Sequence, residues 1–291
     1  MKKVLSILLI CCLAFALCAC GGESTDEGTT DTEATTTTSG SQSLEDIKAA
    51  GEIVIFTNAE FPPFEYRDDN NEIAGVDVDI AKEIANDIGV ELVIEDVNFD
   101  SIVASVQSGK AAFGAAGMTV TEERSQQVDF SIEYISSKQY VILPEGESIE
   151  NIEDLNGKVI GVQSGTTGDF IISDAIEGTD EAEAIIPEAE AKGYTSAILA
   201  SQDLLSGRLD AVVIDKLPAE NIAAANSEAG LTTTELMYAD GSDTTENYAI
   251  CVQKGNTELL EAINATIQRL MDEGAIDQYV VTHSEAGAVS E

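Results

Sequence analysis

GVDVDIAKEIANDIGVELVIE, the stretch at residues 75–95, sets the architecture predicted for this chain. Asp77 is a candidate N-cap, and the apolar residues after it recur at helical spacing on one face of a helix that ends at Gly89. Residues 91–95 then predict a strand. A helix followed at once by a strand is the repeating unit of an α/β sheet. The apolar face consists of Ile80, Ala81, Ile84, Ala85 and Ile88.

The segments on either side continue this alternation. Residues 53–57, IVIFT, predict a buried strand ahead of the helix. Asp100 can cap a further helix, which carries Ile102, Val103 and Val106. The order strand, helix, strand, helix predicts an α/β sheet that is sandwiched by helices.

A second α/β series begins after Ser137. It comprises strands at 139–143, 158–162, near 183–186 and 210–214, a helix from about Thr166 and a helix at about 194–205. A helix at 257–271, with apolar residues at helical spacing, and a short last helix after Gly274 follow. The length of 291 residues is compatible with two lobes or domains.

The first residues predict export. Residues 1–19 have the pattern of a secretory signal peptide, with Lys2 and Lys3 ahead of an apolar run at 4–17 that is too short to span a membrane. Leu17-Cys18-Ala19-Cys20 resembles the lipobox of bacterial lipoproteins, which predicts that Cys20 becomes the lipidated N-terminus. The alternative is an ordinary signal peptide with an incidental cysteine. Residues 20–43 are low in complexity and predict a flexible tether.

Composition excludes several classes of function. The chain has 14 Lys plus Arg against 54 Asp plus Glu, a formal net charge of -40, which disfavours nucleic acid and anionic membrane surfaces as partners. After removal of the signal, Cys251 is the one internal thiol, and its apolar surroundings favour an inert, buried group. The chain has a single histidine, His283. We therefore expect no disulfide framework, catalytic triad, metal site or cofactor.

Gly117 to Arg124, GMTVTEER, is the strongest candidate for a binding segment. The planar guanidinium of Arg124 can hold a carboxylate through two parallel hydrogen bonds. Because cations are scarce in this chain, an arginine in this segment stands out. The alternative is a surface arginine that pairs with a neighbouring acid.

A glycine-rich segment, GVQSGTTGD at 161–169, connects a predicted strand to a predicted helix. Thr166 with Asp169 fits a capping box, and the free amides at such a helix start suit a small anion. No lysine follows the glycine, so this is not a Walker loop. A plain strand-to-helix turn explains the segment equally well.

Asp215 and two aromatic residues complete the candidate set. Asp215 ends an apolar strand, where it can hold an ammonium group or simply cap the next helix. Phe61, in the sequence Phe61-Pro62-Pro63-Phe64, and Phe99 each follow a predicted strand. They can wall an apolar ligand slot or plug the edge of the sheet.

Together these segments resemble the family 3 extracellular solute-binding proteins, the polar amino acid receptors of bacterial ABC importers. The resemblance covers residues from about 44 to 282 and rests on the order of its motifs. These are NAEFPPFEY at 58–66, GVDVDIA at 75–81, 117–124, DFS at 129–131, GKVIGV at 157–162 and GRLDA at 207–211.

The resemblance implies an α/β, two-lobed, type II periplasmic-binding-protein-like fold with two hinge crossings, near 134–139 and 239–248. Lobe 1 would comprise residues 44–136 and 243–291, and lobe 2 residues 137–242. The implied function is capture of a free amino acid for ABC permease subunits, by a monomer that is lipid-anchored at the outer face of the cytoplasmic membrane, extracellular or periplasmic.

Carried over by position, Arg124 would hold the α-carboxylate and Asp215 the α-ammonium of the ligand. Asn58 stands where members that bind cationic amino acids tend to carry an acid, so a neutral or polar ligand side chain is expected. Glu60 keeps a cationic ligand open. The rival function is an enzyme on the same scaffold, such as a cyclohexadienyl or arogenate dehydratase, with Glu60 or Asp215 as acid or base. The remaining implied ligand contacts are Phe61, Phe99, Gly117, Thr119, Gln163, Thr166 and Thr167.

Overall fold

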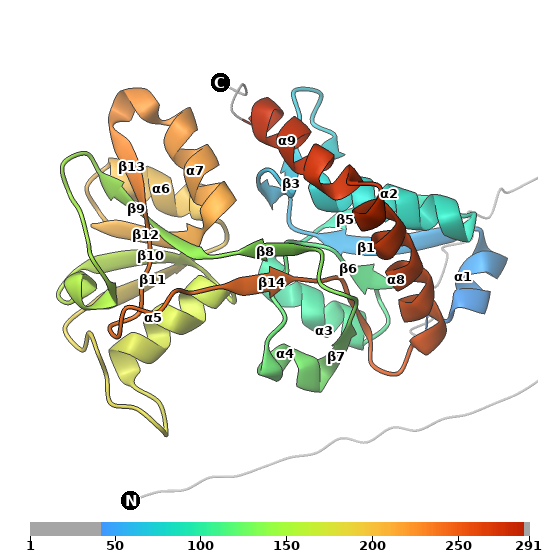
Figure 1. Cartoon of the computed structure of the whole chain (residues 1–291), viewed down its shortest axis with the longest axis horizontal. Helices are drawn as coiled ribbons and strands as arrows, with labels where there is room; N and C mark the ends of the chain where they lie inside the picture. Colours follow the sequence, from blue (N-terminus) through green and yellow to red (C-terminus); the bar gives the residue numbers. More distant parts are fainter. Residues whose placement is uncertain (1–41, 288–291) are drawn as a thin grey trace, which may run out of the picture. The chain divides into compact units, whose positions relative to one another are not determined.

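Two five-stranded sheets and a pair of crossing strands organise the part of the chain that the computed structural model describes, residues 42–287 (Figure 1). The predicted signal peptide at 1–19, the predicted lipidation site Cys20 and the predicted tether as far as residue 41 lie outside this range. None of the helices within it has the length and apolar content that crossing a bilayer would require.

The first sheet has the strand order β5-β1-β6-β15-β7. Strand β1 is parallel to β5 and β6, whereas β15 is antiparallel to both of its neighbours. With its helices and the small sheet β2-β3-β4, it forms what we call the first lobe. Its strands are β1 (Glu52–Thr57), β2 (Glu60–Phe61), β3 (Glu65–Arg67), β4 (Ile73–Ala74), β5 (Glu91–Asp96), β6 (Phe113–Gly114), β7 (Val128–Phe130) and β15 (Cys251–Gln253). Its helices are α1 (Leu44–Ala50), α2 (Val76–Ile88), the 3-10 turn η1 (Phe99–Ser101), α3 (Ile102–Gln107), α4 (Glu122–Gln127), α8 (Thr257–Asp272) and α9 (Ala275–Gly287).

The second sheet has the order β11-β10-β12-β9-β13 and belongs to the second lobe. Its central strand β12 is buried at all five positions, as expected for a strand covered on both faces. The strands are β9 (Gln139–Pro144), β10 (Val159–Gln163), β11 (Glu190–Tyr194), β12 (Ala211–Asp215) and β13 (Leu231–Glu235). The helices are η2 (Ile152–Leu155), α5 (Thr167–Glu177), α6 (Ala197–Leu205), α7 (Lys216–Ala225) and η3 (Ser227–Ala229).

The chain passes between the lobes twice, through β8 (Ile135–Ser137) and β14 (Glu246–Tyr248). These strands pair antiparallel, with Glu246 opposite Ser137 and Tyr248 opposite Ile135, and Figure 1 shows them running between the two sheets. An isolated bridge joins Tyr248 to Thr119. The crossing therefore brings Glu246 and Tyr248 beside the Gly117–Arg124 segment.

The predicted apolar faces form the core. In α2, the predicted residues Ile80, Ala81, Ile84 and Ala85 are all buried. Helix α8 buries four apolar residues, which belong to the same hydrophobic cluster as these α2 residues. Cys251 is a free, fully buried cysteine, and burial raises the pKa of its thiol to about 12, in agreement with the predicted inert group.

Both predicted aspartate N-caps are wrong. Gly75 occupies the N-cap position of α2, at a φ of 138°, because a Cβ there would overlap the carbonyl of Phe64. The Asp77 side chain lies in the interior instead. Asp100 lies inside η1, and Ser101 precedes α3 without a side-chain cap.

The strand predicted near 183–186 is also wrong. The amides of Ile185 and Ile186 both donate to the carbonyl of Ala175 at 2.8 Å, and Ile186 is buried against α5. Its apolar character therefore reflects packing on a helix end. The strand that pairs with β10 is β11, an exposed and largely polar edge strand, for which no apolar run is required. Consequently the next helix begins at Ala197 and not at Tyr194.

Candidate functional site

Arg124 lies in the first turn of α4, where Thr121 caps the helix by accepting a hydrogen bond from the Arg124 amide at 3.1 Å. The side chain is buried, with 5% of its surface exposed, and its guanidinium lies 5.3 Å from the Phe99 ring centre. Nη1 donates to the Thr119 carbonyl at 2.7 Å, and Nη2 donates to the Gly165 carbonyl of the second lobe at 2.9 Å. Within residues 42–287 Arg124 forms no ion pair, so the alternative of a surface arginine paired with an acid does not apply.

Asp77 fixes the start of the Gly117–Arg124 segment. Its Oδ2 accepts a hydrogen bond from the Gly117 amide at 2.7 Å, and the Tyr134 hydroxyl donates to the carboxylate at 2.8 Å. Gly117 has a φ of 53°, and a Cβ there would lie 2.6 Å from Cε1 of Phe61. Burial raises the pKa of Asp77 to about 6 despite these hydrogen bonds. The glycine and the buried acid together allow the backbone to pass close to Phe61.

The second lobe presents the start of α5. Thr166 is its N-cap and accepts from the Asp169 amide at 3.3 Å, as predicted. The return bond of a capping box goes elsewhere, because Asp169 Oδ2 accepts from the Gly165 amide at 2.9 Å. Thr166 Oγ1 donates to the Gln163 carbonyl at 2.8 Å, which ties the helix start to the end of β10.

Asp215 ends β12 and occupies the N-cap position of α7, but its side chain makes no capping hydrogen bond. Instead, Oδ1 accepts from the Tyr248 hydroxyl at 2.5 Å. Burial is the main cause that raises the pKa of Asp215 well above its usual range, and the nearby Glu246 carboxylate adds to the effect. The position therefore favours a carboxylate aimed at the space between the lobes over a plain helix cap.

Nine of the ten predicted ligand-binding residues line one small cavity. Its volume is about 10 Å³, comparable with the space for a single water molecule. Asn58 does not line it, although its Oδ1 accepts a hydrogen bond from Gln163 Nε2 at 2.9 Å across the lobes. The nine are Phe61, Phe99, Gly117, Thr119, Arg124, Gln163, Thr166, Thr167 and Asp215.

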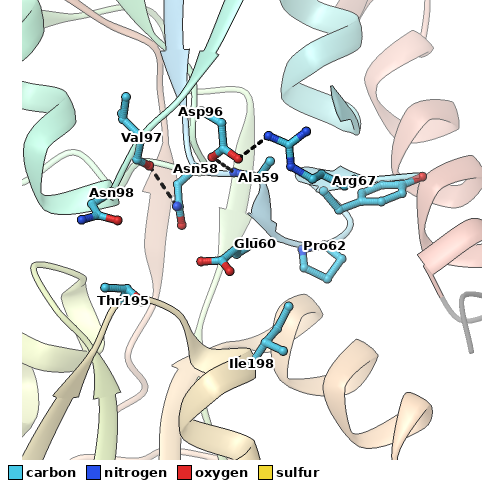
Figure 2. Close-up of a pocket in the computed structure, with 11 residues that line it drawn as sticks. Asn58, Ala59, Glu60, Pro62, Arg67, Asp96, Val97, Asn98, Thr195 and Ile198 are labelled. Atoms are coloured by element: carbon cyan, nitrogen blue, oxygen red, sulfur yellow. Dashed lines mark hydrogen bonds and ion pairs between the residues drawn. The ribbon is translucent and has the colours of Figure 1, made fainter. Parts of the chain in front are cut away.

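A second pocket, of about 600 Å³, opens on the other side of Asn58. Figure 2 shows Asn58, Glu60 and Pro62 of the first lobe facing Thr195 and Ile198 of the second across this pocket. Asp96, which also lines this pocket, forms a salt bridge with Arg67 at 2.8 Å. Glu60 lines this larger pocket and not the small cavity.

The sequence did not single out Gln139, Glu246 and Tyr248, which surround the Asp215 side of the cavity. Thr119 Oγ1 donates to Glu246 Oε2 at 2.6 Å, and Gln139 Nε2 donates to Glu246 Oε1 at 2.7 Å. The only sequence signal for these three residues was the short segment ENY at 246–248. In it, an acid and a tyrosine stand two positions apart, just ahead of an apolar strand. Within the described residues no group of histidine, cysteine or acidic side chains is arranged to hold a metal ion.

The model of the bacterial extracellular solute-binding proteins, family 3, matches residues 53–284. The chain belongs to this family. Among solved structures, this solute-binding protein is similar to the amino acid ABC transporter substrate-binding protein AbpA from Streptococcus pneumoniae, bound to L-arginine. The two share 31% identity and a TM-score of 0.77, over 84% of this chain and 100% of AbpA. The predicted two-lobed, type II periplasmic-binding fold is confirmed.

Curated relatives bind different solutes, according to their names. The arginine-binding extracellular protein ArtP of Bacillus subtilis is 28% identical over 282 residues, 96% of each chain. The L-cystine-binding protein TcyJ of Escherichia coli K12 is 26% identical over 235 residues, which is 80% of this solute-binding protein and 82% of TcyJ. Membership in the family therefore leaves the solute of this chain open.

Proposed function

We propose that this solute-binding protein captures a free amino acid between its lobes and delivers it to the permease of an ABC importer. One observation carries the proposal: a buried guanidinium from the first lobe and a buried carboxylate from the second line the same cavity. A free amino acid is a zwitterion with complementary charges on neighbouring atoms. It would bridge Arg124 and Asp215 and thereby favour closure of the lobes.

The α-carboxylate is assigned to Arg124. Two of the five N–H donors of the Arg124 guanidinium donate to the Thr119 and Gly165 carbonyls. These hydrogen bonds fix the orientation of the guanidinium plane. The other donors remain for a carboxylate in the cavity, with Gly117, Thr119 and Thr167 beside it.

The α-ammonium is assigned to Asp215. It ends the central strand β12 at the edge of the sheet that faces the first lobe, and it is 4% exposed. Burial destabilises the ionised form of this carboxyl and raises its pKa, so an ammonium that donates N–H hydrogen bonds to it stabilises the ionised form strongly.

The ligand side chain is assigned to the space between Phe61, Phe99 and the pair Asn58 and Gln163. Gln163 donates through Nε2 to Asn58, while its buried Oε1 has no partner within the described residues. An unpaired buried acceptor favours a side chain that brings an N–H or O–H donor. Asn58 places no charge here, so we propose a neutral, polar side chain. Glu60, in the larger pocket, would be reached by a longer cationic one.

Ligand entry requires that the lobes separate. A cavity of about 10 Å³ cannot admit an amino acid, and hydrogen bonds from Arg124 to Gly165 and from Gln163 to Asn58 join the lobes across it. Opening breaks the bond from Arg124 to Gly165 and the bond from Gln163 to Asn58, and frees the polar atoms that the ligand would engage.

We further propose the lobe limits 44–136 with 243–291, and 137–242, together with a monomeric state. Export and attachment follow from the N-terminal sequence: a signal at 1–19, a lipid on Cys20 and a tether at 20–43. Replacing Cys20 by Ala tests the attachment. The variant is expected in the soluble fraction of the producing bacterium, whereas retention in the membrane fraction would contradict it.

The function is tested by calorimetric titration with a panel of L-amino acids that includes Gln, Asn, His, Arg and Glu, beside a turnover assay on prephenate and arogenate. For at least one amino acid whose side chain carries an N–H or O–H donor, we expect a dissociation constant in the micromolar range, which corresponds to a binding free energy of about -8 kcal/mol. Turnover without amino acid binding would support the dehydratase and contradict the proposal.

A further inference from the structure

A third space lies at the Arg124 end of the site. It has a volume of about 170 Å³, and residues of η1, α3 and α4 from the first lobe and of the start of α5 from the second line it. In Figure 1, α3 and α4 lie on the same side of the crossing strands as α5. Arg124 lines both this space and the small ligand cavity. The residue therefore forms part of the wall between the two.

Phe170 is a large aromatic residue that the core of its own lobe does not use. It lies in the second turn of α5 and is 37% exposed. Its neighbours Ile171 and Ile172 pack in the core of the second lobe, but Phe170 belongs to none of the hydrophobic clusters that the described residues form. Its ring lies against Arg124 instead, with 5.9 Å between the guanidinium carbon and the ring centre.

Arg124 thus has an aromatic ring from each lobe beside its guanidinium. The distances to the ring centres of Phe99 and Phe170, 5.3 Å and 5.9 Å, are both within the reach of cation–π attraction. Phe99 belongs to the same lobe as Arg124, so this contact persists when the lobes separate. The contact with Phe170 joins different lobes and requires that they are closed.

Gly165 brings the backbone of the second lobe to the same place. Its carbonyl accepts from Arg124 Nη2 at 2.9 Å, and its φ of 78° lies in the left-handed region that favours glycine. A Cβ at this position would lie 3.0 Å from Cβ and 3.3 Å from Cα of Asp100 in the first lobe. A side chain would therefore crowd the contact between the lobes beside Arg124.

The two residues act on the ligand site through the guanidinium. Phe170 lines the space of about 170 Å³ and not the ligand cavity, so it covers Arg124 on the side away from the ligand. Charge-assisted hydrogen bonds to a carboxylate are stronger where water is excluded. Interactions that form only in the closed arrangement also favour closure, and closure raises the affinity for a ligand held between the lobes.

We propose that Phe170 and Gly165 are positioning residues for the α-carboxylate of the ligand: from the second lobe, they orient and cover the Arg124 guanidinium when the lobes close. This inference rests on the proposed function. Neither residue lines the ligand cavity. The affinity for the amino acid therefore depends on two residues that do not touch it.

The test replaces Phe170 by leucine, which keeps an apolar side chain but removes the ring. Calorimetry measures the binding of L-glutamine, L-asparagine, L-histidine, L-arginine and L-glutamate to the whole protein, and stopped flow measures the rates for the tightest of them. We expect Phe170→Leu to bind about two- to fivefold more weakly, the range that an exposed cation–π contact supports. The loss should appear in the dissociation rate and leave the association rate unchanged, because the contact forms only on closure.

Three other variants accompany this test. Phe170→Tyr keeps the ring and should bind as the wild type does. Leu199→Ala is the matched control, since Leu199 is a comparably exposed apolar residue of the same lobe, 41% exposed on α6, and it should also bind as the wild type does. Gly165→Ala should lose affinity, because its Cβ would meet Asp100 when the lobes close.

Thermal unfolding without ligand separates the proposed role from a structural one. Phe170→Leu should unfold as the wild type does, because the ring lies outside the described cores. A clear loss of stability would overturn the inference. So would binding by Phe170→Leu within about 1.5-fold of the wild type, an equal loss in Phe170→Tyr, or a loss carried by the association rate. Each of these outcomes leaves the proposed function intact, whereas no binding of any amino acid by the wild type would overturn both.

Discussion

Replacing Arg124 by lysine should remove most of the amino acid affinity while the fold persists. The guanidinium has five N–H donors, of which two bond to the Thr119 and Gly165 carbonyls, at 2.7 and 2.9 Å. An ammonium has one nitrogen, which cannot reach both carbonyls and both oxygens of a carboxylate. At least one charge-assisted hydrogen bond is lost, at a cost of about 1.5 to 3 kcal/mol. This corresponds to roughly 10- to 150-fold weaker binding.

Calorimetric titration measures the dissociation constants, and thermal unfolding without ligand measures the effect on stability. The matched control is Arg208→Lys, since Arg208 is exposed on the second lobe and pairs with Asp203. It should bind as the wild type does. If Arg124→Lys stays folded and binds within about threefold of the wild type, the assignment of Arg124 to the α-carboxylate is refuted.

Three further predictions concern the packing around the site. Gly117→Ala should lower the free energy of unfolding by about 1 to 3 kcal/mol in chemical denaturation, because its Cβ would lie 2.6 Å from Phe61 at a φ of 53°; unchanged stability would contradict this. The pKa of Asp77 is raised from 3.8 to about 6, so folding binds a proton between these values, and the wild type should lose about 2 kcal/mol of stability relative to Asp77→Asn as the pH rises from about 4 to 6. A difference between the two that does not vary with pH would argue against the buried acid. Cys251 should react with a thiol reagent at least about 100-fold more slowly in the native protein than after unfolding, since its pKa is raised to about 12; rapid native labelling would show that it is accessible.

Periodic apolar segments and turn chemistry made most of the fold predictable from the sequence. The strands at 53–57 and 91–95 and the helix at 257–271 needed only local patterns, and the structure places all three within a residue of their predicted ends. The polar edge strand β11 could not be found in this way. Its identity depends on pairing with β10, a contact between distant segments, and the apolar residues of 184–186 gave a competing local signal.

The candidate site was predictable where a residue's position followed from a motif. Arg124, Gly117 and Asp215 were named on that basis, and the structure brings them to one cavity. Asp77 and Glu246 show where local patterns fail. Asp77 has the position of a helix cap, yet it accepts a hydrogen bond from a glycine amide 40 residues away, and the crossing strand β14 brings Glu246 to the Thr119 hydroxyl. Buried polar networks of this kind depend on tertiary pairing, which no local spacing encodes.

The central claim is that Arg124 and Asp215 hold the two ends of one zwitterion. Its most direct test is a calorimetric comparison of the tightest-binding L-amino acid with two analogues, one lacking the α-carboxylate and one with the α-amine acetylated. The account predicts a micromolar dissociation constant for the amino acid and a loss of at least about 100-fold for each analogue, because each leaves one buried charge unpaired. Comparable affinity for either analogue would contradict it.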